Sequence, residues 1–224
     1  MTIAPAPAIT DSVADRARHI AETVTGPAAA DVDAAARFPQ ESIVALRDAG
    51  LLAALIPTEL GGLGASLADV AAATEVLGRH CASTAMIFAM HHIQVACLVQ
   101  HGGTPHLRRL LEDIARDGLL LASATTEVGI GGDVRSSLCA VVHGERYSLT
   151  KQAPVISYGA YADIILATAR RTPDSPANDQ SLVVCRKAAY SLEPTSVWDT
   201  LGFRGTCSPG FVLRADGPPD DILP

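Results

Sequence analysis

Hydrophobic residues recur at helical spacing through the first half of the chain. Apolar positions three and four residues apart predict helices over 11–24, 39–49, 66–77, 81–100 and 104–117. Ser66 with Asp69 three residues later, and Thr104 before Pro105, are typical helix starts. Glycines that follow the last periodic residues supply the stops. We therefore expect residues 38–117 to be entirely helical.

The pattern changes to short apolar and β-branched runs from Gly118 onward. Clusters of Gly, Pro, Asp and Ser separate these runs, which is typical of strands. The expected strands cover 121–124, 138–143, 147–150, 164–168, 181–185 and 207–213, with Gly144 and Glu145 turning a hairpin. Their regular spacing suggests a small β-barrel or sandwich.

Helices followed by strands indicate an α+β fold. We expect a tail and first helix over 1–37, a helical N-terminal domain over 38–117, and a β domain over 118–224. The glycine-rich loop near residue 130 is expected to face the junction between the last two.

Composition and charge limit the classes of function. The chain has 224 residues and a net charge of −7, without concentrated Lys and Arg, which argues against nucleic-acid and anionic-membrane partners. No signal-peptide pattern and no run of about 20 apolar residues is present. The five cysteines have no C-x-x-C spacing and predict reduced thiols rather than a zinc site. We expect a cytoplasmic protein.

Two adjacent histidines, His91 and His92, lie within the predicted helix 81–100. Neighbouring residues on a helix point about 100° apart, so this pair cannot share a metal as an i,i+4 pair could. We expect core or solvated histidines, and no metal-binding residue is identified.

The stretch 121–134, L-A-S-A-T-T-E-V-G-I-G-G-D-V, combines an apolar run with a loop that holds Gly129, Gly131 and Gly132. Such glycines let the backbone adopt positive φ and let a bulky ligand approach closely. Successive N–H groups in such a turn can bind an anion. The hydroxyls of Thr125 and Thr126 could hydrogen-bond a flat heteroaromatic ring. A plain strand with a polar glycine turn explains these residues equally well.

Four further segments accompany this loop in a fixed order. They are G-G-L-G at 61–64, H-G-G-T-P-H-L-R-R-L-L at 101–111, V-I-S-Y-G-A-Y-A-D at 155–163 and L-G-F-R-G-T-C-S at 201–208. With T-E-V-G-I-G-G-D at 126–133, they resemble the acyl-CoA dehydrogenase family of flavoproteins over about residues 38–224.

The resemblance implies FAD as the cofactor and assigns it a set of contacts. Thr126 corresponds to the threonine on the pyrimidine side of the flavin, and Ser157 takes the place of a threonine near flavin N5. Gly132 is implied as a substrate contact as well. The full set of implied cofactor residues is Thr125, Thr126, Gly131, Gly132, Val155, Ile156 and Ser157.

Several residues depart from the family pattern around the cofactor. Val155 stands where many members have an aromatic residue that covers the flavin, so a stacking contact is lost. Gly132 replaces a serine and Val128 a proline. The usual lysine of G-x-K is replaced in register by Ala153, and Lys151 lies two residues earlier. These changes indicate a diverged branch of the family.

The family also has a C-terminal helical bundle that carries a catalytic glutamate in most members. This chain stops where that bundle should begin, and nothing promotes Glu127 to the role of base, so no catalytic residue is identified. We expect a homo- or hetero-oligomer, with a partner chain that supplies the bundle.

The resemblance therefore implies an FAD-dependent acyl-CoA dehydrogenase of fatty acid metabolism, or a subunit or fragment of one, that acts on an acyl-CoA or acyl-carrier thioester. Two alternatives remain open. One is a flavin-dependent monooxygenase of the same fold, and the other is a non-catalytic subunit or truncated remnant that pairs with a complete partner.

Overall fold

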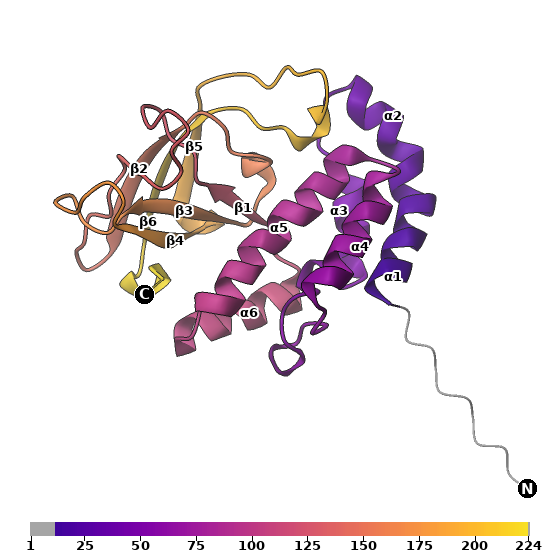
Figure 1. Cartoon of the computed structure of the whole chain (residues 1–224), viewed down its shortest axis with the longest axis horizontal. Coiled ribbons are helices and arrows are strands. Elements are labelled where there is room, and N and C mark those ends of the chain that lie inside the picture. The colour runs from indigo at the N-terminus through magenta and orange to yellow at the C-terminus, as the bar shows by residue number, and fades with distance from the viewer. Residues whose placement is uncertain (1–11, 224) are drawn as a thin grey trace, which may run out of the picture.

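A computed structural model describes residues 12–223, and most of the expected N-terminal tail lies outside them. The described residues form six α-helices, which lie together on one side of the protein (Figure 1). Their bounds are α1 Val13–Ile20, α2 Gly26–Ala34, α3 Gln40–Asp48, α4 Leu67–Gly78, α5 Ala82–His101 and α6 Pro105–Asp117. The helical first half is as predicted.

The first helix extends beyond its predicted end at residue 24. A π-helical turn over Ala21–Thr25 joins α1 to α2, so helical structure continues to Ala34. The missed part, A-A-A-D-V-D-A, has little apolar periodicity. Alanine nevertheless has the highest helix propensity, and Val32 is the residue that this segment buries.

Two predicted helix starts and two glycine stops are confirmed. Ser66 Oγ accepts a hydrogen bond of 3.2 Å from the Asp69 N–H, and the Asp69 carboxylate accepts one of 2.8 Å from the Ser66 N–H. Thr104 Oγ1 accepts from the Leu107 N–H in the same way. Gly50 and Gly118, which follow α3 and α6, have positive φ of 72° and 60°.

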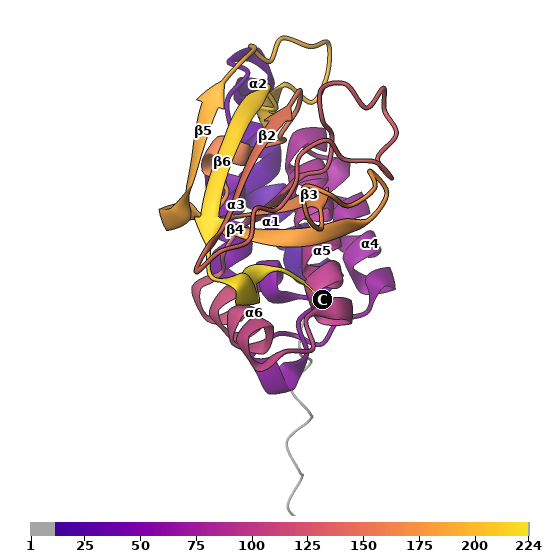
Figure 2. The same ribbon diagram turned by 90° about the vertical axis from the view of Figure 1, so that its left-hand side faces the viewer.

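The second half contains six strands in two sheets. The strands are β1 Leu121–Ala124, β2 Tyr147–Ala153, β3 Ile164–Arg170, β4 Gln180–Arg186, β5 Tyr190–Pro194 and β6 Phe211–Gly217. One sheet has the order β1-β3-β4, with β1 and β3 parallel, and the other has the antiparallel order β2-β6-β5. Strands of one sheet run across those of the other (Figure 2). The α+β class is confirmed.

Two strand predictions need correction, and one strand was not predicted. Residues 138–143 form no strand, and of the expected hairpin only the isolated bridge from Val142 to Ser148 remains, while Ala140 makes an isolated bridge to Arg170 of β3. The last strand begins at Phe211 instead of residue 207, because Cys207 has a φ of 43° that breaks the extended backbone. Strand β5 was missed because its residues are mostly exposed and lack a buried apolar run.

Helix α5 lies between helices α1 to α4 and the sheets (Figure 1). By length and composition it could cross a membrane, but more than half of its apolar window is buried inside the protein. Its buried residues include Ile87, Phe88 and both histidines. The expectation of core histidines is therefore confirmed.

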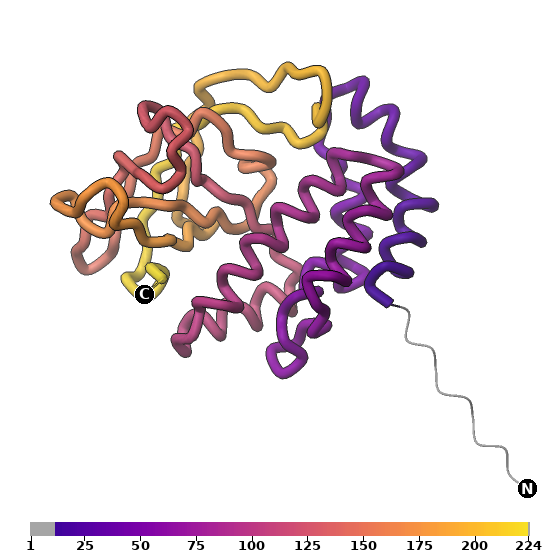
Figure 3. The backbone as a smooth tube through the Cα atoms, in the orientation of Figure 1, coloured from indigo at the N-terminus to yellow at the C-terminus, as the bar shows by residue number. Residues whose placement is uncertain are grey.

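The segment between β5 and β6 crosses from the sheets to the helices, as the backbone trace shows (Figure 3). Arg204 attaches the middle of this segment to the helices, because its Nε donates a hydrogen bond of 2.8 Å to the carbonyl of Asp33 near the end of α2. All five cysteines are free, and Cys81, Cys139 and Cys185 are buried.

Candidate functional site

Strand β1, which leads into the glycine loop, starts on helix α5. The Leu121 N–H donates 3.0 Å to Nδ1 of His91, and the His91 Nε2–H donates 2.7 Å to the carbonyl of Leu52. Burial lowers the pKa of His91 to about 4, so the ring is neutral and can fill both roles. The start of the loop-bearing strand is fixed to the helices.

A second anchor holds the same strand from the other side. The Asp163 carboxylate accepts 2.8 Å from the Leu120 N–H, and Arg47 reaches it at 3.4 Å. Arg47 also donates 2.8 Å from its Nε to the carbonyl of Gly118. The sequence pattern did not reveal this role of Asp163, whose signal was its place at the end of the A-Y-A-D segment.

The turn at 155–158 is held against β1 by Tyr158. This residue has a φ of 45°, its hydroxyl donates 2.9 Å to the carbonyl of Leu121, and its N–H donates 2.8 Å to that of Thr206. The ring is completely buried, which raises the pKa of its hydroxyl. Nothing in the sequence singled out Tyr158, because buried turn tyrosines carry no characteristic spacing.

The two segments that were predicted to share a ligand lie in contact. Thr126 Oγ1 donates 3.2 Å to the carbonyl of Val155. Thr125 and Ser157 are half-buried. Within residues 12–223, neither of their hydroxyls forms a hydrogen bond, so both are free to bind a ligand.

The glycines of the loop have the backbone conformation that was predicted. Gly129, Gly131 and Gly132 have φ of 97°, 61° and 86°. A Cβ added at Gly131 or Gly132 would meet no atom within 4 Å. These two glycines therefore border open space, where a ligand could approach the backbone.

Val155 and Ile156 differ in what they can offer a ligand. Val155 is 36% exposed, whereas the Ile156 side chain is fully buried. The Ile156 N–H donates to the carbonyl of Pro209, and its own carbonyl accepts from the Gly159 N–H. Ile156 therefore presents no side-chain surface to a ligand, and its backbone groups already have partners.

Glu127 is buried and its carboxylate is fully occupied. Its donors are Ser137 Oγ at 2.8 Å, the Leu138 N–H at 3.0 Å, the Cys139 N–H at 2.6 Å and Lys151 Nζ at 3.1 Å. Burial raises the pKa of Glu127, but the Ser137 hydrogen bond and the Lys151 charge outweigh it and lower the pKa. Such a carboxylate is a poor proton acceptor, which explains why Glu127 does not qualify as a base.

A polar cavity of about 690 Å³ lies beside the glycine loop, lined by Asp133, Val134, Arg135, Ser136, Asn178 and Gln180. A separate and far more apolar groove of about 680 Å³ runs between α4 and α5. The two cavities share no residue. In the described part of the chain, no group of three His, Cys, Asp or Glu residues could hold a metal ion.

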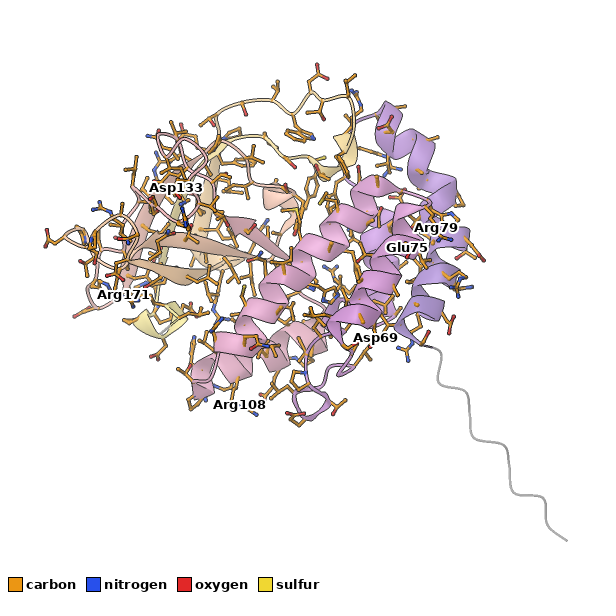
Figure 4. All side chains as sticks on the ribbon, viewed as in Figure 1. Asp69, Glu75, Arg79, Arg108, Asp133 and Arg171 are labelled. Carbon is orange, nitrogen blue, oxygen red and sulfur yellow. The ribbon has the colours of Figure 1, made fainter. Side chains whose placement is uncertain are left out.

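The glycine loop does not face the helices as expected. Asp133, which closes it, lies over the sheets and away from α5 (Figure 4). The reason is the direction of β1, which starts at α5 through Leu121 and extends away from it by roughly 3.3 Å per residue.

Sequence comparisons identify relatives of this chain. Residues 10–117 match the family described as "Acyl-CoA dehydrogenase, N-terminal domain". Cyclohex-1-ene-1-carbonyl-CoA dehydrogenase of Geobacter metallireducens is 30% identical, over 93% of this chain and 56% of that protein.

Solved structures show the same fold. Butyryl-CoA dehydrogenase of Megasphaera elsdenii superposes with a TM-score of 0.82 at 19% identity, over 100% of this chain and 60% of that one. The dibenzothiophene monooxygenase TdsC of Paenibacillus, in complex with FMN and indole, gives 0.82 at 25% identity, over 94% and 53%. The chain spans about half the length of the curated relatives that it matches.

Proposed function

We propose that this chain, which belongs to the acyl-CoA dehydrogenase family, binds FAD and serves in the α,β-dehydrogenation of an acyl thioester. The observation that carries the proposal is the contact of Thr126 Oγ1 with the Val155 carbonyl. It joins the glycine loop to the 155–157 turn, and these are the two segments expected at the flavin.

The residues present fit a flavin. The free hydroxyls of Thr125 and Ser157 can donate to polar edges of its ring, and Gly131 and Gly132 leave room for its phosphates beside backbone N–H groups. Thr126 holds the two segments together and can exchange its bond to Val155 for one to the ring. FAD, when bound, supplies the redox chemistry, and the protein orients the reactants.

The substrate that we propose is an acyl-CoA or acyl-carrier thioester, with Gly132 among its contacts. Removal of the α-proton requires a base within hydrogen-bond reach. Glu127 is excluded by its four hydrogen bonds. We therefore propose that the base comes from a partner chain or from a segment other than the glycine loop.

The test is to titrate the purified chain with FAD and follow quenching of flavin fluorescence. We expect saturable binding, and acyl-CoA oxidation with an artificial electron acceptor only when a complete partner is added. A chain that leaves FAD fluorescence unchanged, with or without the partner, would contradict the proposal.

A second candidate is a flavin-dependent monooxygenase. Val155 favours it, because no aromatic ring from this position covers the flavin, and the likeness to dibenzothiophene monooxygenase agrees. The discriminating experiment supplies reduced flavin and oxygen together with aromatic sulfur or indole compounds. Oxygenated product without thioester oxidation would decide for this candidate.

We further propose that the chain works as an oligomer in the cytoplasm, with residues 38–117 and 118–224 as its two units. Large apolar side chains are exposed on two surfaces: Leu67 and Ile93 beside the groove, and Val197, Leu201 and Phe203 on the segment between β5 and β6. Surfaces of this kind mark association sites. Sedimentation velocity would test the oligomeric state. A monomer that carries stoichiometric FAD and oxidises thioesters without a partner would contradict the proposed association.

A further inference from the structure

We propose that Glu127 and Lys151 are positioning residues that close the base of the glycine loop and so hold Thr125, Thr126 and the loop glycines in place for a ligand. The benefit to flavin rests on the proposed function, whereas the closure of the loop does not. Neither residue needs to touch the cofactor to play this role.

The Glu127 carboxylate binds the C-terminal end of its own loop, at residues 137–139. It stands at the start of the loop, yet it accepts hydrogen bonds from the backbone N–H groups of Leu138 and Cys139 and from the Ser137 hydroxyl. The stretch 128–136 is therefore enclosed between two points that one side chain holds together. The Val128 N–H adds a bond of 2.9 Å to the Gln152 carbonyl at the same base.

Lys151 ties this closure to both sheets. It lies on β2, its side chain is fully buried, and its Nζ donates 3.1 Å to Glu127 and 2.9 Å to the carbonyl of Thr168 on β3. Thr168 Oγ1 in turn donates 3.4 Å to the carbonyl of Thr125. A chain of contacts therefore connects the ammonium group to the backbone of a predicted flavin contact.

The alternation of β2 explains how the displaced lysine can work. Tyr147, Leu149, Lys151 and Ala153 are buried in turn, with exposed residues between them. Positions 151 and 153 thus share the inward face of the strand. A lysine two residues from the family position keeps its direction into the protein, and here it meets the Glu127 carboxylate.

Burial makes this pair a unit. A buried charge without its partner is strongly destabilising, whereas a pair that is removed as a whole costs far less. The side chains of Lys151 and Glu127 are 0% and 5% exposed to solvent. Loss of one partner should therefore release the loop base, and loss of both should release it less.

The experiment compares Glu127→Gln, Lys151→Met and the double variant with the unaltered full chain. Glu193→Gln is the matched control, because its exposed pair with Arg214 joins β5 to β6 in the sheet that also contains β2. Hydrogen–deuterium exchange without ligand reports on the loop itself. FAD titration and the visible spectrum of bound FAD at saturation report on the site.

We expect the single variants to raise amide exchange in residues 128–139 about tenfold or more, with little change in the helices. They should also weaken FAD binding and alter the spectrum of the FAD that still binds. The double variant should be no worse than either single one. Glu193→Gln should leave all three measurements unchanged.

Exchange that rises equally across both sheets would show a merely structural pair and overturn the proposal. Unchanged loop exchange would overturn it as well, as would an unaltered spectrum of bound FAD. Failure of the unaltered chain to bind FAD would instead defeat the proposed function, and the exchange data without ligand would still decide whether the pair closes the loop.

Discussion

The backbone N–H of Leu121 donates a hydrogen bond of 3.0 Å to Nδ1 of His91. One buried imidazole therefore joins helix α5 to strand β1, and through β1 to the glycine loop. Because Nδ1 accepts this bond, Nε2 must carry the proton that it donates to the Leu52 carbonyl. A protonated ring could no longer accept from Leu121.

We predict that His91→Phe destabilises the protein by about 2–4 kcal/mol, because it orphans the buried Leu121 N–H and the Leu52 carbonyl. The free energy of unfolding from urea titration would measure it. His101→Phe is the matched control, since His101 is exposed at the end of the same helix. Equal losses in the two variants would contradict the role of His91.

The same imidazole makes stability depend on pH. The folded pKa of about 4 lies below the ordinary value of 6.5, mainly because of burial, so protonation favours the unfolded state. The contribution of the neutral His91 ring to the free energy of unfolding is fully present above about pH 6.5. It is lost as the pH falls toward 4, and the loss amounts to about 3 kcal/mol at most. Burial also lowers the pKa of His92, so protonation of His92 destabilises the fold at low pH as well. The positive charge of Arg47 lowers the pKa of His91 further.

Unfolding free energies measured between pH 7 and about 4 would test this window. The His91→Phe variant should show a shallower decline than the unaltered chain. A decline of the same slope in both would assign the acid sensitivity to other groups. Glu127 is one such group, because its pKa is lowered in the folded state and its protonation at lower pH therefore destabilises the protein.

The fold could be predicted wherever local chemistry decides it. The Ser66–Asp69 capping box and the positive φ of Gly50 depend on neighbouring residues, and both were found from the sequence. The strand predicted at 138–143 does not form. Its apolar residues satisfy a strand pattern, but the Glu127 carboxylate takes the N–H groups of Leu138 and Cys139. Side-chain competition of this kind is invisible to periodicity.

The site could be predicted in its ligand-facing residues but not in its supports. The glycines and threonines of the loop stand in a recognisable order. His91, Asp163 and Tyr158 support β1 from 30 to 43 residues away in sequence. Their roles arise from tertiary contacts, so no spacing rule could reveal them.

We predict that Thr126→Ala weakens FAD binding by about 0.5–1.5 kcal/mol, or roughly two- to tenfold in Kd, because a hydroxyl that links the loop to Val155 is lost. Ser157→Ala should act in the same direction. Fluorescence titration measures both, with Ser148→Ala, an exposed serine of β2, as the control. Unchanged affinity in both site variants would count against the placement of the flavin.

Gly131→Ala should weaken FAD binding more than it weakens the fold. The φ of 61° costs an alanine about 1 kcal/mol, and the new methyl group meets no protein atom but enters the open space assigned to the ligand. Gly103→Ala is the control, because its Cβ also meets open space while its φ lies outside the left-handed region. Titration and thermal unfolding together separate the two effects, and an affinity that falls no further than stability does would remove Gly131 from the site.

The last prediction concerns the buried Asp221, which fastens the end of the described chain to both halves of the protein. Its carboxylate is 1% exposed and pairs with Arg186 of β4 at 2.9 Å and with His106 Nε2 of α6 at 2.7 Å. Removing one partner of a buried carboxylate leaves a charge that water cannot reach.

We expect Arg186→Met to lower the free energy of unfolding by about 2 kcal/mol, less than for a fully buried pair because the Arg186 side chain is 34% exposed. Arg214→Met, which breaks the exposed pair with Glu193, should cost under about 1 kcal/mol. Urea titrations of both variants measure the difference. Adding Asp221→Asn to Arg186→Met should recover part of the loss, because the unpaired buried charge disappears. If the double variant instead loses the sum of the two single losses in free energy of unfolding, the two side chains are not coupled.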